Sequence, residues 1–182
     1  MGKIREVKRV KLLVGLLTAH LTLLDTVREK LEGEWGPVDE VSELMDFNYT
    51  RYYEKEMGNN LKRQFMSFAN LADPGCLPEA KLFTNALEKE LSVKEQRRVN
   101  IDPGYLTPAK LILATTKDYS HRLYLGRGIY GEATLVYSCG SFKPLPWTYP
   151  DYRSEDYSKY FSRVREVCRD QMRKESSITC GG

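Results

Sequence analysis

The sequence predicts an α+β protein that has a ferredoxin-like βαββαβ core, followed by a C-terminal β-meander and a helix extension. Two observations predict this class. Short apolar or alternating runs typical of strands, and longer segments with apolar residues at helical spacing, follow one another in the order β, α, β, β, α, β up to residue 102. Further short strand-like runs and one long amphipathic segment fill the rest of the chain.

The length and the composition fit one packed domain. The chain has 182 residues, of which 41% are hydrophobic and 29% are charged, so we expect a globule and not a disordered chain. The net charge of +3 is spread along the sequence and is too small to indicate nucleic acid by itself. We expect residues 1–9 to be a basic tail, residues 10–175 to be the single domain, and residues 176–182 to be a flexible tail.

The first half of the chain contains four predicted strands and two predicted helices. The strands are expected at residues 10–17, 38–47, 61–68 and 98–102. The run Val10–Leu17 is apolar throughout, which favours a strand buried on both faces. One helix is stopped by Gly36 and Pro37, and the other has Pro78 at its first position.

The second half is predicted to begin with a helix and to continue as a meander. Thr107 and Pro108 form a good helix start, so residues 108–116 are expected to be one short helix, although the β-branched residues there leave a strand open. Strands are expected at 121–125 and 129–137, followed by an extended proline-rich piece at 143–150. Ser154 should cap the final helix, whose apolar stripe runs from Tyr157 to Met172.

Several classes of protein are disfavoured by the sequence. No apolar run approaches the roughly 18 residues of a membrane span, and Leu12–Ala19 is better explained as a buried strand than as a signal peptide, so no membrane partner is expected. The four cysteines are scattered, as in reduced cytoplasmic proteins, and the two histidines lack metal-ligand spacing. The chain contains neither a P-loop motif nor the nucleophile elbow of α/β-hydrolases.

The strand expected at residues 98–102 supplies the first group of candidate side chains. Because side chains alternate along a strand, Arg98, Asn100 and Asp102 should share the face opposite Val99 and Ile101. Proline and glycine at the next two positions predict a type II turn. Asp102 therefore has two open roles: it accepts backbone N–H bonds within the turn, or it contacts a ligand or metal ion.

A glycine-rich hairpin supplies the second group. A three-residue loop at residues 126–128 would place Tyr124 opposite Tyr130 and Arg122 opposite Glu132. These pairs either stabilise the hairpin, by about 0.2–1 kcal/mol each, or form a surface for a planar polar ligand. Residues 126–131 spell G-x-G-x-x-G, but the strands expected on both sides do not fit the dinucleotide-binding fingerprint. The glycines are then turn residues, or they cradle a phosphate beside Arg127.

The two groups define one candidate site if the strand end and the hairpin meet in a shared hollow. Its basic and aromatic side chains would bind a phosphate-bearing ligand, while its carboxylates would accept hydrogen bonds or hold a divalent ion. No cofactor is specified by the sequence. The expected ligand-binding residues are Arg98, Asn100, Tyr105, Lys117, Arg122, Arg127, Tyr130 and Glu132, and the expected catalytic residues, if the protein is an enzyme, are His121 as the proton carrier and Asp102.

Two classes of function are compatible with these residues. The first is the binding of a small polar or phosphate-bearing ligand, such as a nucleotide, at the polar face of the sheet. The second is a non-catalytic module that binds RNA or protein, because the RNA recognition motif shares the βαββαβ order. Phe65–Phe68 matches half of that motif's third-strand pattern, and the segment Trp147–Tyr152 offers rings for stacking.

Motifs spread from residue 10 to residue 172 resemble one known family. They include VKLLVGLL near the N-terminus, VNIDPGYLT and TTKDYSHRLYLGRGIYGE in the middle, and PLPWTYPDYRS before the last helix. In these segments the chain is similar to a prokaryotic domain-of-unknown-function family whose members are sometimes labelled GTP-binding proteins. The resemblance implies no activity and no catalytic residues, and the missing P-loop does not support the GTP label.

Overall fold

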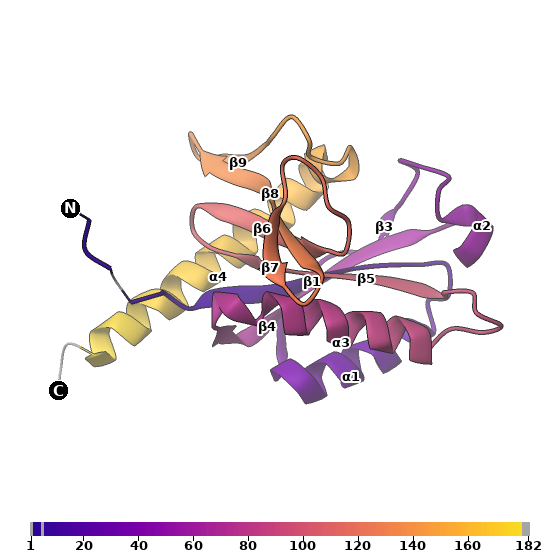
Figure 1. Cartoon of the computed structure of the whole chain (residues 1–182), viewed down its shortest axis with the longest axis horizontal. Coiled ribbons are helices and arrows are strands. Elements are labelled where there is room, and N and C mark those ends of the chain that lie inside the picture. Colours follow the sequence, from indigo (N-terminus) through magenta and orange to yellow (C-terminus); the bar gives the residue numbers. More distant parts are fainter. Residues whose placement is uncertain (1, 5, 180–182) are drawn as a thin grey trace.

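The computed structural model describes residues 2–4 and 6–179, which form a mixed α/β fold built on one large antiparallel sheet (Figure 1). The strands are β1 (Val10–Thr18), β2 (Val38–Val41), β3 (Met45–Asp46), β4 (Lys62–Ala72), β5 (Val99–Leu106), β6 (Lys110–Thr115), β7 (Leu123–Gly126), β8 (Ile129–Ser138) and β9 (Ser141–Pro144). The α-helices are α1 (Leu23–Trp35), α2 (Glu54–Met57), α3 (Leu77–Glu90) and α4 (Glu155–Thr179), with short 3-10 turns at Pro74–Cys76 and Asp151–Arg153. The predicted α+β class is confirmed.

The sheet has a core half and an added half. Its strands follow the order β2-β4-β1-β5-β6-β8-β7, with β3 paired to β4 and β9 paired to β8, and every pair is antiparallel. Helices α1 and α3 cover one face, and the long helix α4 runs across the other (Figure 1). The β5–β6 ladder therefore joins the two halves.

Strand β1 shows why the core needs helices on both faces. All nine of its residues are buried. Leu12, Val14 and Leu16 pack with α1 and α3, whereas Leu13 packs with α4, as the two-residue period of a strand requires. Burying one such leucine contributes about 1.5–3 kcal/mol. Lys11 is also fully buried, and its ammonium pairs with the Asp39 carboxylate.

Helix α4 packs through the apolar stripe that the sequence predicts. Tyr157, Phe161 and Cys168 are buried, and the Tyr160 ring stacks on Phe65 of β4 with 5.4 Å between the ring centroids. The N–H of Tyr157 donates to the Ser154 hydroxyl at 3.4 Å, which confirms the predicted cap. The helix continues to residue 179 and so includes residues 176–179 of the expected C-terminal tail. Residues 180–182 lie outside the described part of the chain.

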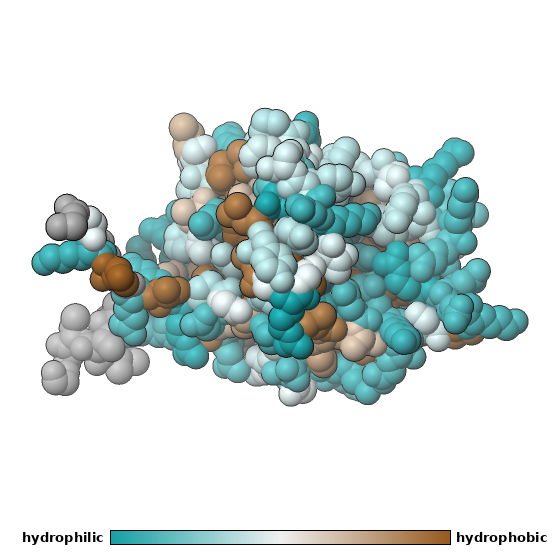
Figure 2. Space-filling model, viewed as in Figure 1, coloured by the Kyte–Doolittle hydropathy of each residue, from teal (hydrophilic) through white to brown (hydrophobic). Residues whose placement is uncertain are grey.

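The visible face in Figure 2 is mostly hydrophilic, with a small apolar patch near the β7–β8 hairpin. Leu123 and Leu125 are exposed there, because β7 is the last strand of the sheet and pairs with β8 alone. None of the helices in residues 2–4 and 6–179 combines the length and the apolar character that a membrane crossing needs. The described residues before Val10 form neither a helix nor a strand.

Two predicted elements are wrong for the same physical reason. Pro103 and Gly104 continue β5 instead of forming a type II turn. A glycine is required at position 104, because a Cβ there would collide with the Ile112 carbonyl of β6. Residues 110–115 form β6 and not a helix. The Thr107 hydroxyl accepts the N–H groups of Ala109 and Lys110, so it closes a tight turn between β5 and β6. In both places tertiary pairing overrides the local signal.

The remaining differences concern strand limits. The expected strand at 38–47 is divided into β2 and β3, and those expected at 61–68 and 98–102 extend to Ala72 and Leu106. The β7–β8 hairpin has a two-residue loop, because Gly126 pairs with Ile129, but the expected Tyr124–Tyr130 pair is confirmed.

Candidate functional site

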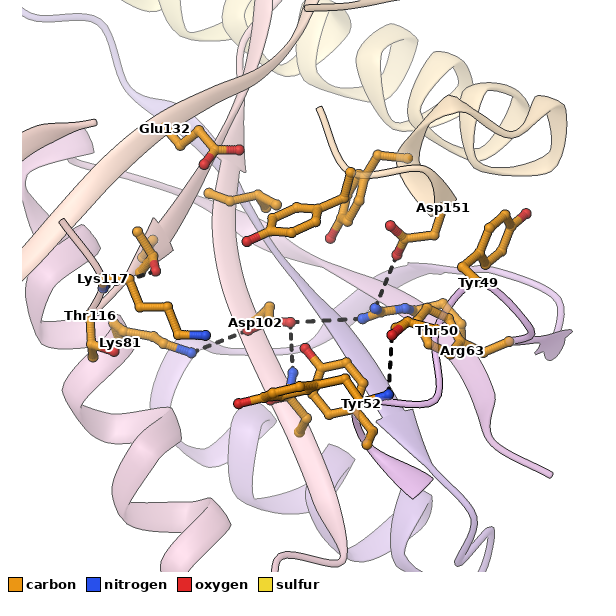
Figure 3. A pocket seen from close by; sticks show the side chains of 18 of the residues that line it. Tyr49, Thr50, Tyr52, Arg63, Lys81, Asp102, Thr116, Lys117, Glu132 and Asp151 are labelled. Atoms are coloured by element: carbon orange, nitrogen blue, oxygen red, sulfur yellow. Dashed lines mark hydrogen bonds and ion pairs between the residues drawn. The ribbon is translucent and has the colours of Figure 1, made fainter. Parts of the chain in front are cut away.

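A cavity opens where the two halves of the sheet diverge. Strands β5 and β6 pair only from Gly104 to Leu106; before Gly104, β5 stays with β1, while β6 continues beside β8. This divergence, which we call the fork, contains a cavity of about 590 Å³ (Figure 3). Its walls come from β5, β6, β8, α3, the loop at residues 47–53 and the segment at 149–152. The fork is thus a hollow on which distant parts of the chain converge.

Two charged residues of α3 satisfy the backbone that the fork leaves unpaired. The Ile101 N–H donates to Glu88 Oε1 at 2.7 Å, and Lys81 Nζ donates to the Ile101 carbonyl at 3.2 Å. Lys81 and Glu88 are only 7% and 5% exposed. Because a buried peptide group without a partner is costly, these side chains hold the fork open.

Asp102 lies at the centre of the cavity wall (Figure 3). Its carboxylate accepts from Lys81 Nζ at 3.3 Å and from Asn100 Nδ2 at 2.6 Å, and it lies 3.9 Å from Arg63 Nη1. The side chain of Asp102 keeps 28% of its surface exposed. It can therefore accept a further hydrogen bond from a molecule in the cavity. The predicted turn role of Asp102 is wrong, since no turn exists there.

Arg63 is almost fully buried beside Asp102. Its Nη2 donates to Asp151 Oδ2 at 3.2 Å, and the guanidinium lies over the Phe47 ring at 5.3 Å. Gly15 of β1 makes room for Arg63 and Phe65, because a Cβ there would be 3.1 Å from Arg63 Nη1 and 2.9 Å from Phe65 Cε1. Nε and Nη1 of Arg63 are buried beside the hydroxyls of Tyr152 and Tyr157.

Arg122 and Glu132 form a buried ion pair that fixes the opposite wall. Arg122 Nε donates to Glu132 Oε2 at 2.8 Å, and its Nη atoms donate to the Lys117 carbonyl at 3.0 Å and to the Tyr149 hydroxyl at 3.1 Å. His121 Nε2 lies 3.1 Å from the same Glu132 oxygen. The predicted Arg122–Glu132 pairing is confirmed, and it ties two loops to β8.

Burial changes the acid–base properties of several groups around the cavity. Burial raises the pKa of Glu88 and of Asp151 above the usual range of carboxyl groups, although nearby cations oppose the shift. Burial, together with the Asp102 carboxylate, raises the pKa of Tyr53 to about 12. At the edge of the site, the Arg97 guanidinium donates to Glu56 at 2.7 and 2.8 Å and lowers the pKa of that carboxyl.

The mouth of the cavity differs from its walls. Lys117 is exposed, and no carboxylate of the described chain lies within 4 Å of its ammonium. Lys117 Nζ instead lies 5.4 Å from the centre of the Tyr52 ring, across the mouth. Tyr119 and Tyr149 are also exposed there. The mouth thus combines a cation without an anionic partner and several aromatic rings.

The structure brings five of the ten predicted site residues to the cavity, namely Asn100, Asp102, Lys117, Arg122 and Glu132. His121 lies behind Glu132 and does not line the cavity. The other four lie elsewhere: Arg98 near the start of β5, Tyr105 against the cluster of Leu77, Ala114 and Ile129, Arg127 in a surface ion pair with Glu79, and Tyr130 against Tyr124. Tyr105 is displaced because an odd position on β5 faces away from Asp102.

Sequence reasoning missed the contribution of α3 and of the buried arginine on β4. Lys81 and Glu88 interrupt the buried face of α3 at positions where apolar residues are the norm. These two charged residues on an otherwise apolar helix face could have indicated from the sequence that α3 contributes to a site. Arg63 had no comparable signal, because its burial depends on Gly15, Asp102 and Asp151, which come from three separate segments.

The fold and the site define a mixed α/β protein with a cavity, lined by charged and aromatic side chains, inside one antiparallel sheet. The chain belongs to the family described as Domain of unknown function (DUF4416), which matches residues 8–167. No curated protein and no solved structure matches the sequence. Across residues 2–4 and 6–179, the structure contains no cluster of three or more His, Cys, Asp or Glu side chains arranged to hold a metal ion.

Proposed function

We propose that the fork binds a small polar molecule that carries an anionic group, a phosphate or a carboxylate. The observation that carries the proposal is the free ammonium of Lys117 at the mouth of a cavity with hydrogen-bonding walls. A volume of about 590 Å³ lies within the range of small-molecule sites. The rings around the mouth would cover the ligand once it is bound.

The charges of the cavity favour this ligand class. Four lining cations already have carboxylate partners: Arg63 with Asp151, Lys81 with Asp102, Arg97 with Glu56 and Arg122 with Glu132. These pairs largely neutralise the walls and hold them in place. Lys117 is left as the lining cation that an incoming anion can pair with, and a lysine ammonium binds phosphate well as a point charge.

A reaction at this site would use the two predicted catalytic residues differently. Asp102 faces the cavity and can touch a ligand directly. His121 would act through Glu132, because the two side chains are 3.1 Å apart and only Glu132 lines the cavity. We propose His121 as a positioning residue for this reason.

We also infer that the first half of the sheet has the ferredoxin-like arrangement. Three observations support this inference: the strand order β2-β4-β1-β5, the antiparallel pairing of neighbours, and the position of α1 and α3 on one face. The fork then marks the point where the added strands leave this core.

A thermal-shift screen tests the proposed function. Phosphate- and carboxylate-bearing compounds should raise the melting temperature of the wild-type protein, and Lys117→Ala should abolish the increase. Lys110→Ala is the matched control, because Lys110 is an exposed lysine of the neighbouring strand β6 that does not line the cavity. The proposal fails if no anionic compound shifts the melting temperature, or if both variants lose the shift equally.

One observation favours a second function, the binding of single-stranded RNA. The rings of Tyr119, His121 and Trp147 form a stack, with centroid distances of 6.0 and 5.1 Å and interplanar angles of 13° and 14°. Tyr119 and Trp147 are exposed, and unpaired bases stack on such rings. RNA binding would weaken steeply between low and moderate salt and would be lost in Trp147→Ala, whereas a pocket ligand would respond little to either change.

A further inference from the structure

Residues 48–52 lie at the mouth of the cavity with little attachment to the rest of the protein. All five are exposed, and they contain neither a helix nor a strand. The hydrogen bonds that they make within the described structure stay close by: the Tyr52 N–H donates to the Thr50 hydroxyl at 3.1 Å, and the Arg51 carbonyl accepts from the Glu54 N–H at 3.1 Å. A segment with few buried contacts and no hydrogen bond to the body of the protein opens easily.

Both ends of this segment are fixed to the body of the protein. On one side Phe47 is buried, and its N–H donates to the Leu61 carbonyl at 3.0 Å. On the other side Tyr53 packs against the buried cluster that contains Phe47, Met57 and Leu61. Residues 48–52 therefore swing about these two anchors when they move, as the hinged loops over many binding sites do.

The segment faces Lys117 across the mouth. Three of its residues line the cavity, namely Tyr49, Thr50 and Tyr52. Figure 3 shows these three on one side of Asp102 and Lys117 on the other. The Lys117 ammonium lies 5.4 Å from the centre of the Tyr52 ring, which is a cation–π distance, and such a contact is weak at an exposed site. The segment is therefore held across the mouth by a contact that breaks and forms again easily.

A bound anion would strengthen this closure. The anion would pair with the Lys117 ammonium, and the Tyr52 hydroxyl, which makes no hydrogen bond within the described structure, can donate to one of its oxygens. Closing also excludes water from the ammonium, and a charge pair is stronger away from water. An anion that binds the closed segment more tightly than the open one shifts the equilibrium toward closure.

We propose that residues 48–52 are a lid that closes over an anion held by Lys117, with Tyr52 as the lid residue that touches the ligand. The proposal rests on the function proposed above and adds a conformational step to it. The ligand enters past the open lid, and the lid closes once the anion has paired with Lys117. Because opening breaks no buried hydrogen bond of the segment, ligand exchange needs no wider unfolding.

Limited digestion of the whole protein with trypsin tests the lid, because Arg51 is an exposed cleavage site within it. The probe is inorganic phosphate at about ten times the dissociation constant measured by titration calorimetry, and potassium chloride of the same ionic strength is the salt control. Phosphate should slow cleavage after Arg51 at least about fivefold. Cleavage after Lys94, an exposed lysine between α3 and β5 that does not line the cavity, should not change. Lys117→Ala should abolish the protection of Arg51.

Tyr52→Ala tests the contact between the lid and the ligand. It should weaken phosphate binding by about 2–5-fold and reduce the protection of Arg51. The free variant should melt at the same temperature as the wild type, because Tyr52 is 65% exposed. Tyr124→Ala is the matched control, since Tyr124 is 63% exposed and lies on β7, outside the cavity. The control should change neither the binding nor the protection.

The possible outcomes distinguish the two proposals. If phosphate does not bind to the wild-type protein, Lys117 is not an anion site, and the proposed function fails together with the lid. If phosphate binds through Lys117 but Arg51 is cleaved at the same rate with and without it, the lid is overturned and the anion site stands. Equal protection of Arg51 and Lys94 also overturns the lid, because phosphate then acts on the whole protein or on trypsin. A Tyr52→Ala variant with wild-type binding and protection overturns the contact assigned to Tyr52.

Discussion

Replacing Glu88 tests whether α3 holds the fork open. Glu88→Ala removes the acceptor of the buried Ile101 N–H, which costs about 1–3 kcal/mol when nothing replaces it. Loss of the partly exposed contact with Arg97, at 3.4 Å, adds less than about 1 kcal/mol. Relief from burying a carboxylate offsets part of the sum at neutral pH. We expect a net loss of about 2 kcal/mol in the free energy of unfolding.

Urea denaturation at pH 7 measures this loss, and two variants serve as comparisons. Glu88→Gln keeps an acceptor oxygen for the Ile101 N–H, so it should cost less than about 1 kcal/mol. Glu90→Ala removes an exposed carboxylate from the end of the same helix and should change stability by no more than about 0.5 kcal/mol. The role assigned to Glu88 is refuted if its alanine and glutamine variants are equally stable, or if Glu88→Ala behaves like Glu90→Ala.

Three further predictions follow from buried groups elsewhere. Gly15→Ala should destabilise the protein by about 1–3 kcal/mol, because the added methyl would lie 2.9 Å from Phe65 Cε1 and 3.1 Å from Arg63 Nη1. Gly33→Ala on the open surface of α1 should instead stabilise it by about 0.5–1 kcal/mol. Equal effects of the two substitutions in urea denaturation would contradict this prediction. Burial raises the pKa of the Asp151 carboxyl above its usual value of 3.8. The protonated carboxyl therefore stabilises the folded protein fully below pH 3.8, and this contribution is lost as the pH rises through the pKa of the folded state. Melting curves from pH 3.8 to 7 should therefore show a smaller loss of stability on raising the pH in Asp151→Asn than in the wild type, and parallel curves would refute the assignment. Lys11→Ala should cost about 3 kcal/mol in urea denaturation, because it leaves its carboxylate partner on β2 without a cation, and a cost below about 1 kcal/mol would show that the pair is dispensable.

The fold was largely predictable because most of its elements obey one local pattern each. The apolar run of β1 and the helical stripe of α4 are properties of neighbouring residues, and both are confirmed. The errors occur where a local signal has two structural meanings. Thr107 and Pro108 suit either a helix start or a tight turn. The residues that follow them form a strand because they pair with β8.

The candidate site was only partly predictable, because its geometry depends on where two strands separate. Alternation along β5 correctly placed Asn100 and Asp102 on one face, and hairpin register correctly paired Arg122 with Glu132. The fork itself requires knowledge of which strands pair, and that information is not local. Arg63 could not be assigned to the fork from the sequence, because it lies on β4, which is separated from β5 by β1 in the sheet.

The most direct measurement for the central claim is a crystal structure of the protein with the tightest-binding anion of the thermal-shift screen. We predict ligand density within the fork, with an anionic oxygen within about 4 Å of Lys117 Nζ. Density for the ligand at another surface, with an empty fork at a saturating concentration, would contradict the account.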